Sequence, residues 1–188
     1  MSQRPGKALF LDRDGVINVD HGYVWRQEEF EFLPGIFDLV RAARAHDYRI
    51  VIVTNQSGIG RGYYSEEDFQ ALTHWMKDRF AQEQAAIDAV FHCPYHPEAP
   101  TAAYRQNHPW RKPAPGMLLA AAEQLATDLA SSIFIGDKET DVQAGHAAGI
   151  GTMLLFAPDA QQGHSYAGAT GVIRSLTEAE AWLVNAPG

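Results

Sequence analysis

Hydrophobic residues in this chain form short continuous runs that alternate with longer segments of helical periodicity. The short runs are rich in β-branched and aromatic residues, and each is apolar enough to be buried on both faces. They predict five strands, at residues 7–12, 48–55, 89–93, 131–137 and 151–156. Strands separated by helices predict a parallel sheet, because parallel neighbours need a crossover connection that is usually helical.

Amphipathic patterns between these runs predict the helices. Residues 34–46 carry apolar side chains at positions 36, 39, 40 and 43. Residues 65–84 begin with a serine cap and acidic residues, and positions 69, 72, 76 and 80 form one apolar stripe. Further helices are expected at 115–126, 139–149 and 177–184. The expected fold class is therefore α/β, a doubly wound parallel sheet with helices on both faces.

Residues 92–115 break this alternation, since they contain six prolines and little periodicity. They predict a long surface loop. The 188 residues, 46% of them hydrophobic, can fill the core of one domain over residues 1–188. The segment between the first two strands has no room for a large helical cap.

Charge and cysteine content narrow the class of protein. The net charge of −8, without a run of lysines or arginines, argues against nucleic acid as a partner. The apolar stretch near the start is too short for a signal peptide or a membrane span. A single cysteine, Cys93, cannot form an intrachain disulfide and suits a reducing compartment. We expect a cytoplasmic monomer without a membrane partner.

Ligands of such sheets bind beyond the carboxyl ends of the strands, so polar residues there are candidates for function. Asp12 and Asp14, in LDRDG, would point to the same side of an extended chain. At about 6 Å their repulsion costs roughly 3 kcal/mol at an effective dielectric of 20, which favours a bound cation. Asp137, in IGDKETD, adds a third carboxylate, followed by Lys138 and Asp141. Converging carboxylates suit Mg²⁺.

Two further stretches supply hydrogen-bond donors for a phosphate group. Thr54 opens VTNQSG, in which a hydroxyl and the following amides can donate to phosphate oxygens. Arg111 and Lys112, between prolines in WRKP, combine a planar bidentate donor with a point charge. Taken singly, each stretch also fits a simpler structure: a solvated carboxylate pair, a helix cap, a strand-to-loop turn or a solvated basic pair.

Together, and in this order, the stretches resemble the haloacid dehalogenase-type phosphohydrolases. FLDRDGVINVDHGY, IVTNQSGIGRG, RKPAPGM and GDKETD are most similar to the sugar bisphosphate phosphatases of that family, and the similarity extends to about residue 156. The resemblance implies that Asp12 is the nucleophile and Asp14 the general acid and base. It also implies that Thr54 and Lys112 stabilise the phosphoryl group, and that Mg²⁺ is held by Asp12, the backbone carbonyl of Asp14 and Asp137.

The same resemblance implies a set of substrate-binding residues for a small phosphorylated sugar. They are Asp20, His21, Gly22, Tyr23, Asn55, Gln56, Ser57, Arg111 and Lys138. Arg111 would recognise the substrate through its second phosphate, while DHGY also fits a plain turn. Histidinol phosphate and a polynucleotide end remain alternative substrates. A non-catalytic protein of the same fold would be expected to lack Asp12, Asp14 or Lys112.

Zinc is a point of departure from the family. Its members often carry a zinc loop of the form Cys-x-His followed by Cys-x-Cys, and the corresponding positions here are Cys93, Tyr95, His108 and Trp110. Only Cys93 and His108 are candidate ligands, whereas structural zinc normally takes four Cys or His side chains. We therefore expect Mg²⁺ as the cofactor and no zinc.

Overall fold

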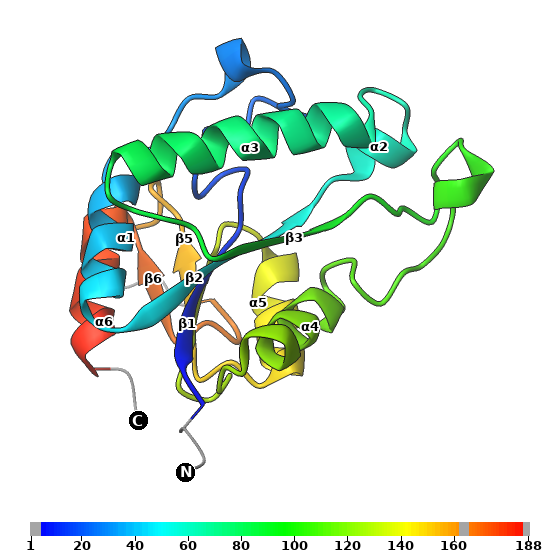
Figure 1. Cartoon of the computed structure of the whole chain (residues 1–188). Helices are drawn as coiled ribbons and strands as arrows, with labels where there is room; N and C mark the ends of the chain where they lie inside the picture. The colour runs from blue at the N-terminus through cyan, green and yellow to red at the C-terminus, as the bar shows by residue number, and fades with distance from the viewer. Residues whose placement is uncertain (1–4, 162–165, 186–188) are drawn as a thin grey trace.

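The computed structural model describes residues 5–161 and 166–185. Its centre is a six-stranded sheet in the order β3-β2-β1-β4-β5-β6 (Figure 1). The strands are β1 (Lys7–Leu11), β2 (Tyr48–Asn55), β3 (Ala89–Cys93), β4 (Ile133–Gly136), β5 (Thr152–Phe156) and β6 (Gly171–Ile173). Neighbouring strands all run parallel, which confirms the predicted sheet.

Five of these strands lie where the hydrophobic runs predict them, within two residues at each end. The edge strand β6 is missing from the sequence prediction, because three residues are too few to show a period. Residues 1–4, 162–165 and 186–188 lie outside the described residues. The absence of a signal peptide at the start and the single domain over residues 1–188 therefore stay predictions.

The helices cover both faces of the sheet (Figure 1). On one face lie α1 (Ile36–Ala45), α3 (Glu66–Gln82) and α6 (Glu180–Asn185), and on the other lie α4 (Gly116–Leu125) and α5 (Glu139–Ala148). Alternate residues of β1 divide between these layers, as the period of a strand requires. Leu9 and Leu11 pack with α1 and α3, whereas Ala8 and Phe10 pack with α4 and α5.

The long helix α3 shows why the helix predictions hold. Ser65 and Asp68 form a capping box, in which each side chain accepts a hydrogen bond from the backbone N–H of the other residue. The predicted apolar stripe of α3 is buried.

Two other segments differ from their predicted structure. In the tail, the predicted helix is a 3-10 turn (Leu176–Ala179) that continues into α6. VTNQSG continues into a short helix, α2 (Ser57–Gly60), and not into the strand-to-loop turn that is its simpler alternative.

The strand order changes direction between β1 and β4, which places a crevice at the carboxyl ends of these two strands. Asp12 follows β1 directly, and Asp137 follows β4 directly. The predicted loop between β3 and α4 is irregular apart from a 3-10 turn (Ala102–Tyr104). No large cap covers the crevice in the described part of the chain. None of its helices has the length and hydropathy that a membrane crossing requires.

Candidate active site

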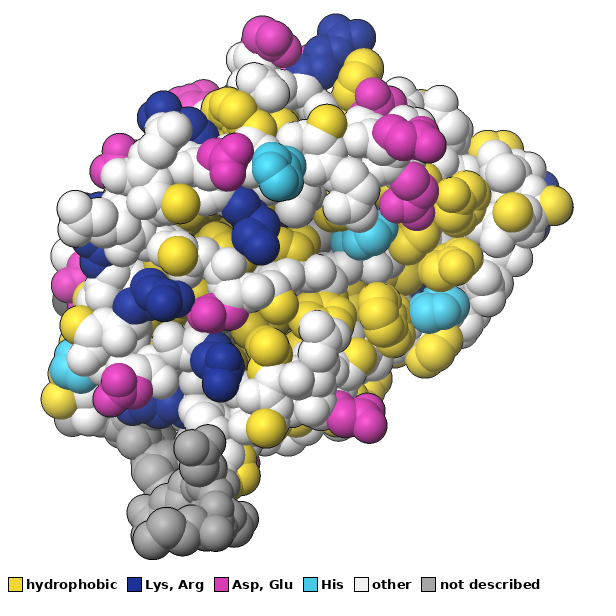
Figure 2. Space-filling view, viewed as in Figure 1, with side chains coloured by type: hydrophobic (Ala, Val, Ile, Leu, Met, Phe, Trp, Pro, Cys, Tyr) yellow, Lys and Arg dark blue, Asp and Glu magenta, His cyan; other side chains and the backbone are white. Residues whose placement is uncertain are grey.

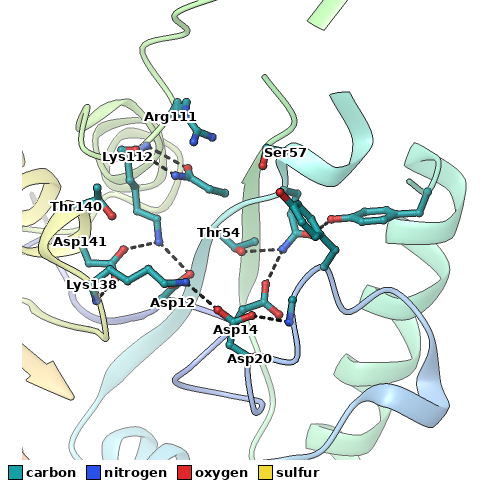
Figure 3. Close-up of a pocket in the computed structure, with 15 residues that line it drawn as sticks. Asp12, Asp14, Asp20, Thr54, Ser57, Arg111, Lys112, Lys138, Thr140 and Asp141 are labelled. Atoms are coloured by element: carbon teal, nitrogen blue, oxygen red, sulfur yellow. Dashed lines mark hydrogen bonds and ion pairs between the residues drawn. The ribbon is translucent and has the colours of Figure 1, made fainter. Parts of the chain in front are cut away.

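The centre of the crevice is a buried lysine between two aspartates (Figure 3). Lys112 Nζ lies 2.9 Å from Asp12 Oδ1 and 2.6 Å from Asp141 Oδ1, and it donates to the carbonyl oxygen of Val53 at 3.0 Å. As whole residues, backbone included, Asp12, Lys112 and Asp141 are each at most 5% exposed. Such a cluster holds its charge only because every partner is present, since an uncompensated buried charge is costly.

Burial and neighbouring charges shift the pKa values of this cluster. Burial raises the pKa of Asp12 to about 8, with further increases from Asp141 and Asp137, against the lowering effect of Lys112. Burial alone would lower the pKa of Lys112, but Asp12 and Asp141 raise it above its ordinary value. The lysine therefore stays charged, and the carboxylates exceed it in number.

Asp12, Asp137 and Asp141 could hold a metal ion, because one oxygen of each lies within 4.8 Å of the others. Asp137 Oδ1 is buried and has no hydrogen-bond partner. Burial raises the pKa of Asp137 to about 6. Gly15 leaves the space that Asp137 fills, since a Cβ there would lie 2.2 Å from Asp137 Oδ2. An unpaired oxygen among excess carboxylates fits a hard divalent cation such as Mg²⁺.

Asp14 lines the same crevice but belongs to a different network of hydrogen bonds. Its carboxylate accepts from Arg13 Nη2 at 2.8 and 2.9 Å, from Asn18 Nδ2 at 3.0 Å and from Gln56 Nε2 at 3.1 Å. The amide of Gln56 also donates to Thr54 Oγ1 at 2.9 Å. These bonds hold Asp14 near Asp12, the predicted nucleophile. The carboxylate of Asp14 nevertheless stays outside the cluster formed by Asp12, Lys112 and Asp141.

The two predicted donor stretches meet through their backbones and side chains. Asn55 Nδ2 donates to the carbonyl oxygen of Lys112 at 3.1 Å, and Asn55 Oδ1 accepts from the N–H of Lys112 at 3.1 Å. This reciprocal pair ties the end of β2 to the segment before α4. Ser57, at the start of α2, lines the same cavity of about 430 Å³.

The predicted substrate loop forms one wall of the cavity. Asp20 Oδ2 accepts from Lys138 Nζ at 2.9 Å, and its other oxygen accepts from the N–H of Gly22 at 3.0 Å. Burial opposes ionisation of Asp20, but the bond to Lys138 lowers its pKa below the usual value. Tyr23 packs edge-on against Tyr63 at 4.8 Å between ring centroids. His21 faces away from this cavity, into a neighbouring hollow, and lies 3.4 Å from Glu31.

Arg111 also lines the cavity, at the rim on the side opposite Asp20 (Figure 3). Its Nη1 donates to the carbonyl oxygen of Tyr95 at 3.3 Å, and no carboxylate among the described residues forms an ion pair with it. Burial lowers the pKa of Arg111, but a guanidinium stays charged in proteins. The rim therefore carries a positive charge without a counter-charge.

Sequence reasoning missed part of this site. Asp141 was absent from the expected site residues because an acidic residue in the first turn of a helix resembles a capping residue. It does accept from the N–H of Lys138 at 3.0 Å, but its other oxygen binds Lys112. Thr140 also lines the cavity. Arg13, the buried donor to Asp14, is marked in the sequence only by its position between the two predicted catalytic aspartates.

In the region of the family's zinc loop, aromatic side chains pack against one another. The rings of Tyr95 and His108 stack at 4.3 Å, and Trp110 packs against Phe91. Figure 2 shows hydrophobic side chains and histidines gathered on this part of the surface. Cys93 is buried, which raises the pKa of its thiol. The absence of zinc stays a prediction for this loop.

Comparisons with known proteins identify relatives of this chain. The family model described as HAD-hydrolase-like, for haloacid dehalogenase, matches residues 109–179. The D-glycero-α-D-manno-heptose-1,7-bisphosphate 7-phosphatase of Burkholderia mallei is 53% identical over 169 residues, which cover 90% of this chain and 89% of that protein. The chain belongs to the haloacid dehalogenase-like phosphatases. The D-glycero-β-D-manno-heptose-1,7-bisphosphate 7-phosphatase of Vibrio cholerae is 44% identical, over 94% of this chain and 96% of its own.

Solved structures of this family share the fold. A haloacid dehalogenase-like phosphatase from Mesorhizobium loti superposes with a TM-score of 0.87 and 34% identity, over 99% of this chain and 90% of its own. The D,D-heptose 1,7-bisphosphate phosphatase of B. bronchiseptica, complexed with magnesium and phosphate, has a TM-score of 0.80 and 31% identity, over 95% of this chain and 98% of its own.

Proposed function

We propose that the chain is a Mg²⁺-dependent phosphatase that removes the 7-phosphate of D-glycero-D-manno-heptose 1,7-bisphosphate. The observation that carries the proposal is the buried contact of Asp12 with Lys112, beside the unpaired oxygen of Asp137. Relatives at 44% and 53% identity have this activity in their names. The enzyme would act as a cytoplasmic monomer, in the synthesis of ADP-heptose for the lipopolysaccharide core.

The proposed reaction has two steps at phosphorus. Asp12 attacks the 7-phosphate, so that an aspartyl-phosphate forms and the bond from phosphorus to the sugar oxygen breaks. Asp14 gives a proton to the departing alkoxide, which is a poor leaving group without it. Asp14 then takes a proton from the water that attacks the aspartyl-phosphate. Lys112 and Thr54 offset the negative charge that develops on the phosphoryl oxygens.

Asp12, the backbone carbonyl of Asp14 and Asp137 would hold Mg²⁺ in this mechanism. Bound there, the ion would reduce the repulsion between an anionic nucleophile and an anionic phosphate. Asp141 fits a positioning role better than that of a ligand, because its two oxygens already bind Lys112 Nζ and the N–H of Lys138. The cluster thus separates the group that orients Lys112 from the groups that face the cation.

The charge of the rim supports a bisphosphate over histidinol phosphate. Arg111 has no carboxylate partner among the described residues, and its guanidinium can bind a phosphate through two hydrogen bonds. The protonated amine of histidinol phosphate would be repelled by the same charge. A polynucleotide end fits poorly with the net charge of −8.

A panel of phosphorylated metabolites tests the proposal directly. Purified protein with Mg²⁺ is assayed for phosphate release from both anomers of the heptose bisphosphate, from histidinol phosphate and from a 5′-phosphorylated oligonucleotide. We expect the highest kcat/KM for a heptose bisphosphate, and ³¹P NMR should show loss of the 7-phosphate with the 1-phosphate retained. Faster hydrolysis of histidinol phosphate, or loss of the 1-phosphate first, would contradict the proposal.

A further inference from the structure

The side chain of Gln56 has both of its N–H donors engaged inside the site. Its Nε2 donates to Asp14 Oδ2 at 3.1 Å and to Thr54 Oγ1 at 2.9 Å, and an amide nitrogen has only two hydrogens (Figure 3). The backbone N–H of Gln56 donates to the carbonyl oxygen of Cys93 at 2.8 Å. Gln56 lines the cavity but is only 2% exposed. It therefore keeps no N–H for a phosphate oxygen, and its bonds join two other residues of the site.

Tyr64 fixes which way the amide of Gln56 faces. The hydroxyl of Tyr64 donates to Gln56 Oε1 at 2.6 Å. If the amide were turned over, Oε1 would face the carboxylate of Asp14, and two acceptors would meet without a proton between them. Gly58 leaves space for the Tyr64 ring, since a Cβ there would lie 2.2 Å from the ring carbon Cε1, and Trp25 stacks on the same ring. Packing around Tyr64 therefore sets the orientation of the amide.

The amide of Gln56 also directs the hydroxyl proton of Thr54. A hydroxyl has one hydrogen, and Thr54 Oγ1 accepts from Gln56, so the O–H of Thr54 must point away from Nε2. Thr54 lines the cavity, where that O–H can donate to a phosphoryl oxygen. The same nitrogen holds Asp14 Oδ2 on its other side. One atom of Gln56 thus fixes the spacing between the carboxylate of Asp14 and the hydroxyl of Thr54.

We propose that Gln56, oriented by Tyr64, is a positioning residue that aligns Asp14 with Thr54 for the transfer of the phosphoryl group. The inference rests on the proposed function, in which Asp14 gives a proton to the leaving group and Thr54 binds a phosphoryl oxygen. Gln56 itself takes no part in bond breaking. Its removal should therefore matter most for substrates whose leaving group needs the proton of Asp14.

Substrates with different leaving groups test this role, because p-nitrophenolate departs without a proton and a sugar alkoxide does not. Gln56→Leu should lower kcat/KM about a hundredfold for the heptose 1,7-bisphosphate and no more than about tenfold for p-nitrophenyl phosphate. Tyr64→Phe keeps the ring and loses only the hydroxyl, so it should act in the same direction with a smaller effect. Ser132→Ala is the matched control, since it removes hydrogen bonds of a buried side chain before β4, at the opposite end of the sheet. The control should leave the ratio of the two kcat/KM values unchanged.

A series of substituted phenyl phosphates separates this role from the choice of substrate. In Gln56→Leu and, less strongly, in Tyr64→Phe, kcat/KM should fall more steeply than in wild type as the pKa of the leaving phenol rises. An unchanged slope in both variants, or equal losses on the bisphosphate and on p-nitrophenyl phosphate, would overturn the positioning role. Failure of the wild-type enzyme to hydrolyse the bisphosphate would contradict the proposed function alone, because the slopes are measured without that substrate.

Discussion

Two lysine–aspartate pairs of this site have the same length and different surroundings. At the centre, Lys112 Nζ lies 2.9 Å from Asp12, and the two side chains are 3% and 7% exposed. At the rim, Lys138 Nζ lies 2.9 Å from Asp20, and the two side chains are 51% and 34% exposed. Water screens the second pair and almost none reaches the first. Distance alone therefore says little about what either pair contributes.

This difference in exposure suggests different roles for the two pairs. Buried charges keep a strong field at Asp12, the proposed nucleophile, because the surroundings cannot reorganise to weaken it. Exposed charges on loops can adjust to a substrate at a small cost in stability. The chemistry is thus expected from the centre, and the choice of substrate from the rim. Removal of one charge at a time separates the contributions of the two regions.

Asp12→Asn should have the largest effect on activity. It removes the proposed nucleophile and one proposed metal ligand, so kcat should fall by more than about a thousandfold. The amide preserves the shape of the side chain, and the circular dichroism spectrum should remain that of the wild type. Steady-state assays with Mg²⁺ measure the loss. Activity within tenfold of wild type would exclude covalent catalysis by Asp12.

Lys112→Met should have the largest effect on stability. It leaves Asp12 and Asp141 buried without their shared cation, which typically costs about 3–5 kcal/mol. Urea unfolding at pH 7 without metal measures the free energy of unfolding. Lys138→Met, which removes the same charge from the rim, is the control and should cost less than about 1 kcal/mol. Similar losses in both variants would show that burial does not separate the two pairs.

Removal of Mg²⁺ should destabilise the protein in a pH-dependent way. Without metal, the pKa of Asp12 is raised from 3.8 to about 8 and that of Asp137 to about 6. The folded chain then retains protons that the unfolded chain loses above about pH 4, so these groups reduce stability as pH rises from 4 to 8. Mg²⁺ replaces those protons, and its effect should therefore be greater at pH 8 than at pH 5.

Calorimetry with EDTA or with excess Mg²⁺ measures this effect. Saturation at a hundredfold excess over Kd stabilises by about 2.7 kcal/mol, which corresponds to roughly 5–10 °C in Tm for a chain of this size. In Asp12→Asn the loss of stability with rising pH should be smaller. A Tm at pH 8 that does not respond to Mg²⁺ would argue against the carboxylate cluster as its site.

The sequence predicted the fold better than it predicted the contacts of the site. Buried strands such as β2 can be recognised in the sequence as continuous apolar runs, and the helices between them predict that neighbouring strands run parallel. The motifs also placed Asp12, Lys112 and Asp137 at one edge. That Asp141 binds Lys112 depends on how α4 and α5 pack, and the separation of His21 from the cavity depends on the path of one loop. Tertiary packing decides both, and local sequence does not encode it.

Lys138→Met should have the smallest effect on activity. The variant loses the bond to Asp20 that holds the predicted substrate loop, so KM should rise by no more than about tenfold while kcat changes little. Assays with the heptose bisphosphate at low and high ionic strength measure it. Because an exposed pair is screened by salt, the difference from wild type should shrink at high salt. A fall in kcat comparable to that of Lys112→Met would place Lys138 with the chemistry instead.

Chemical trapping of the nucleophile tests most directly whether the chemistry takes place at the buried centre and not at the exposed rim. Enzyme mixed with Mg²⁺ and the heptose 1,7-bisphosphate is quenched within one turnover, treated with borohydride, which reduces acyl phosphates, and digested for mass spectrometry. We expect the reduced carboxyl at Asp12 alone, in wild type and in Lys138→Met, and none in Asp12→Asn. An unmodified Asp12 in enzyme that is releasing phosphate, or modification of another carboxylate, would contradict the proposed mechanism.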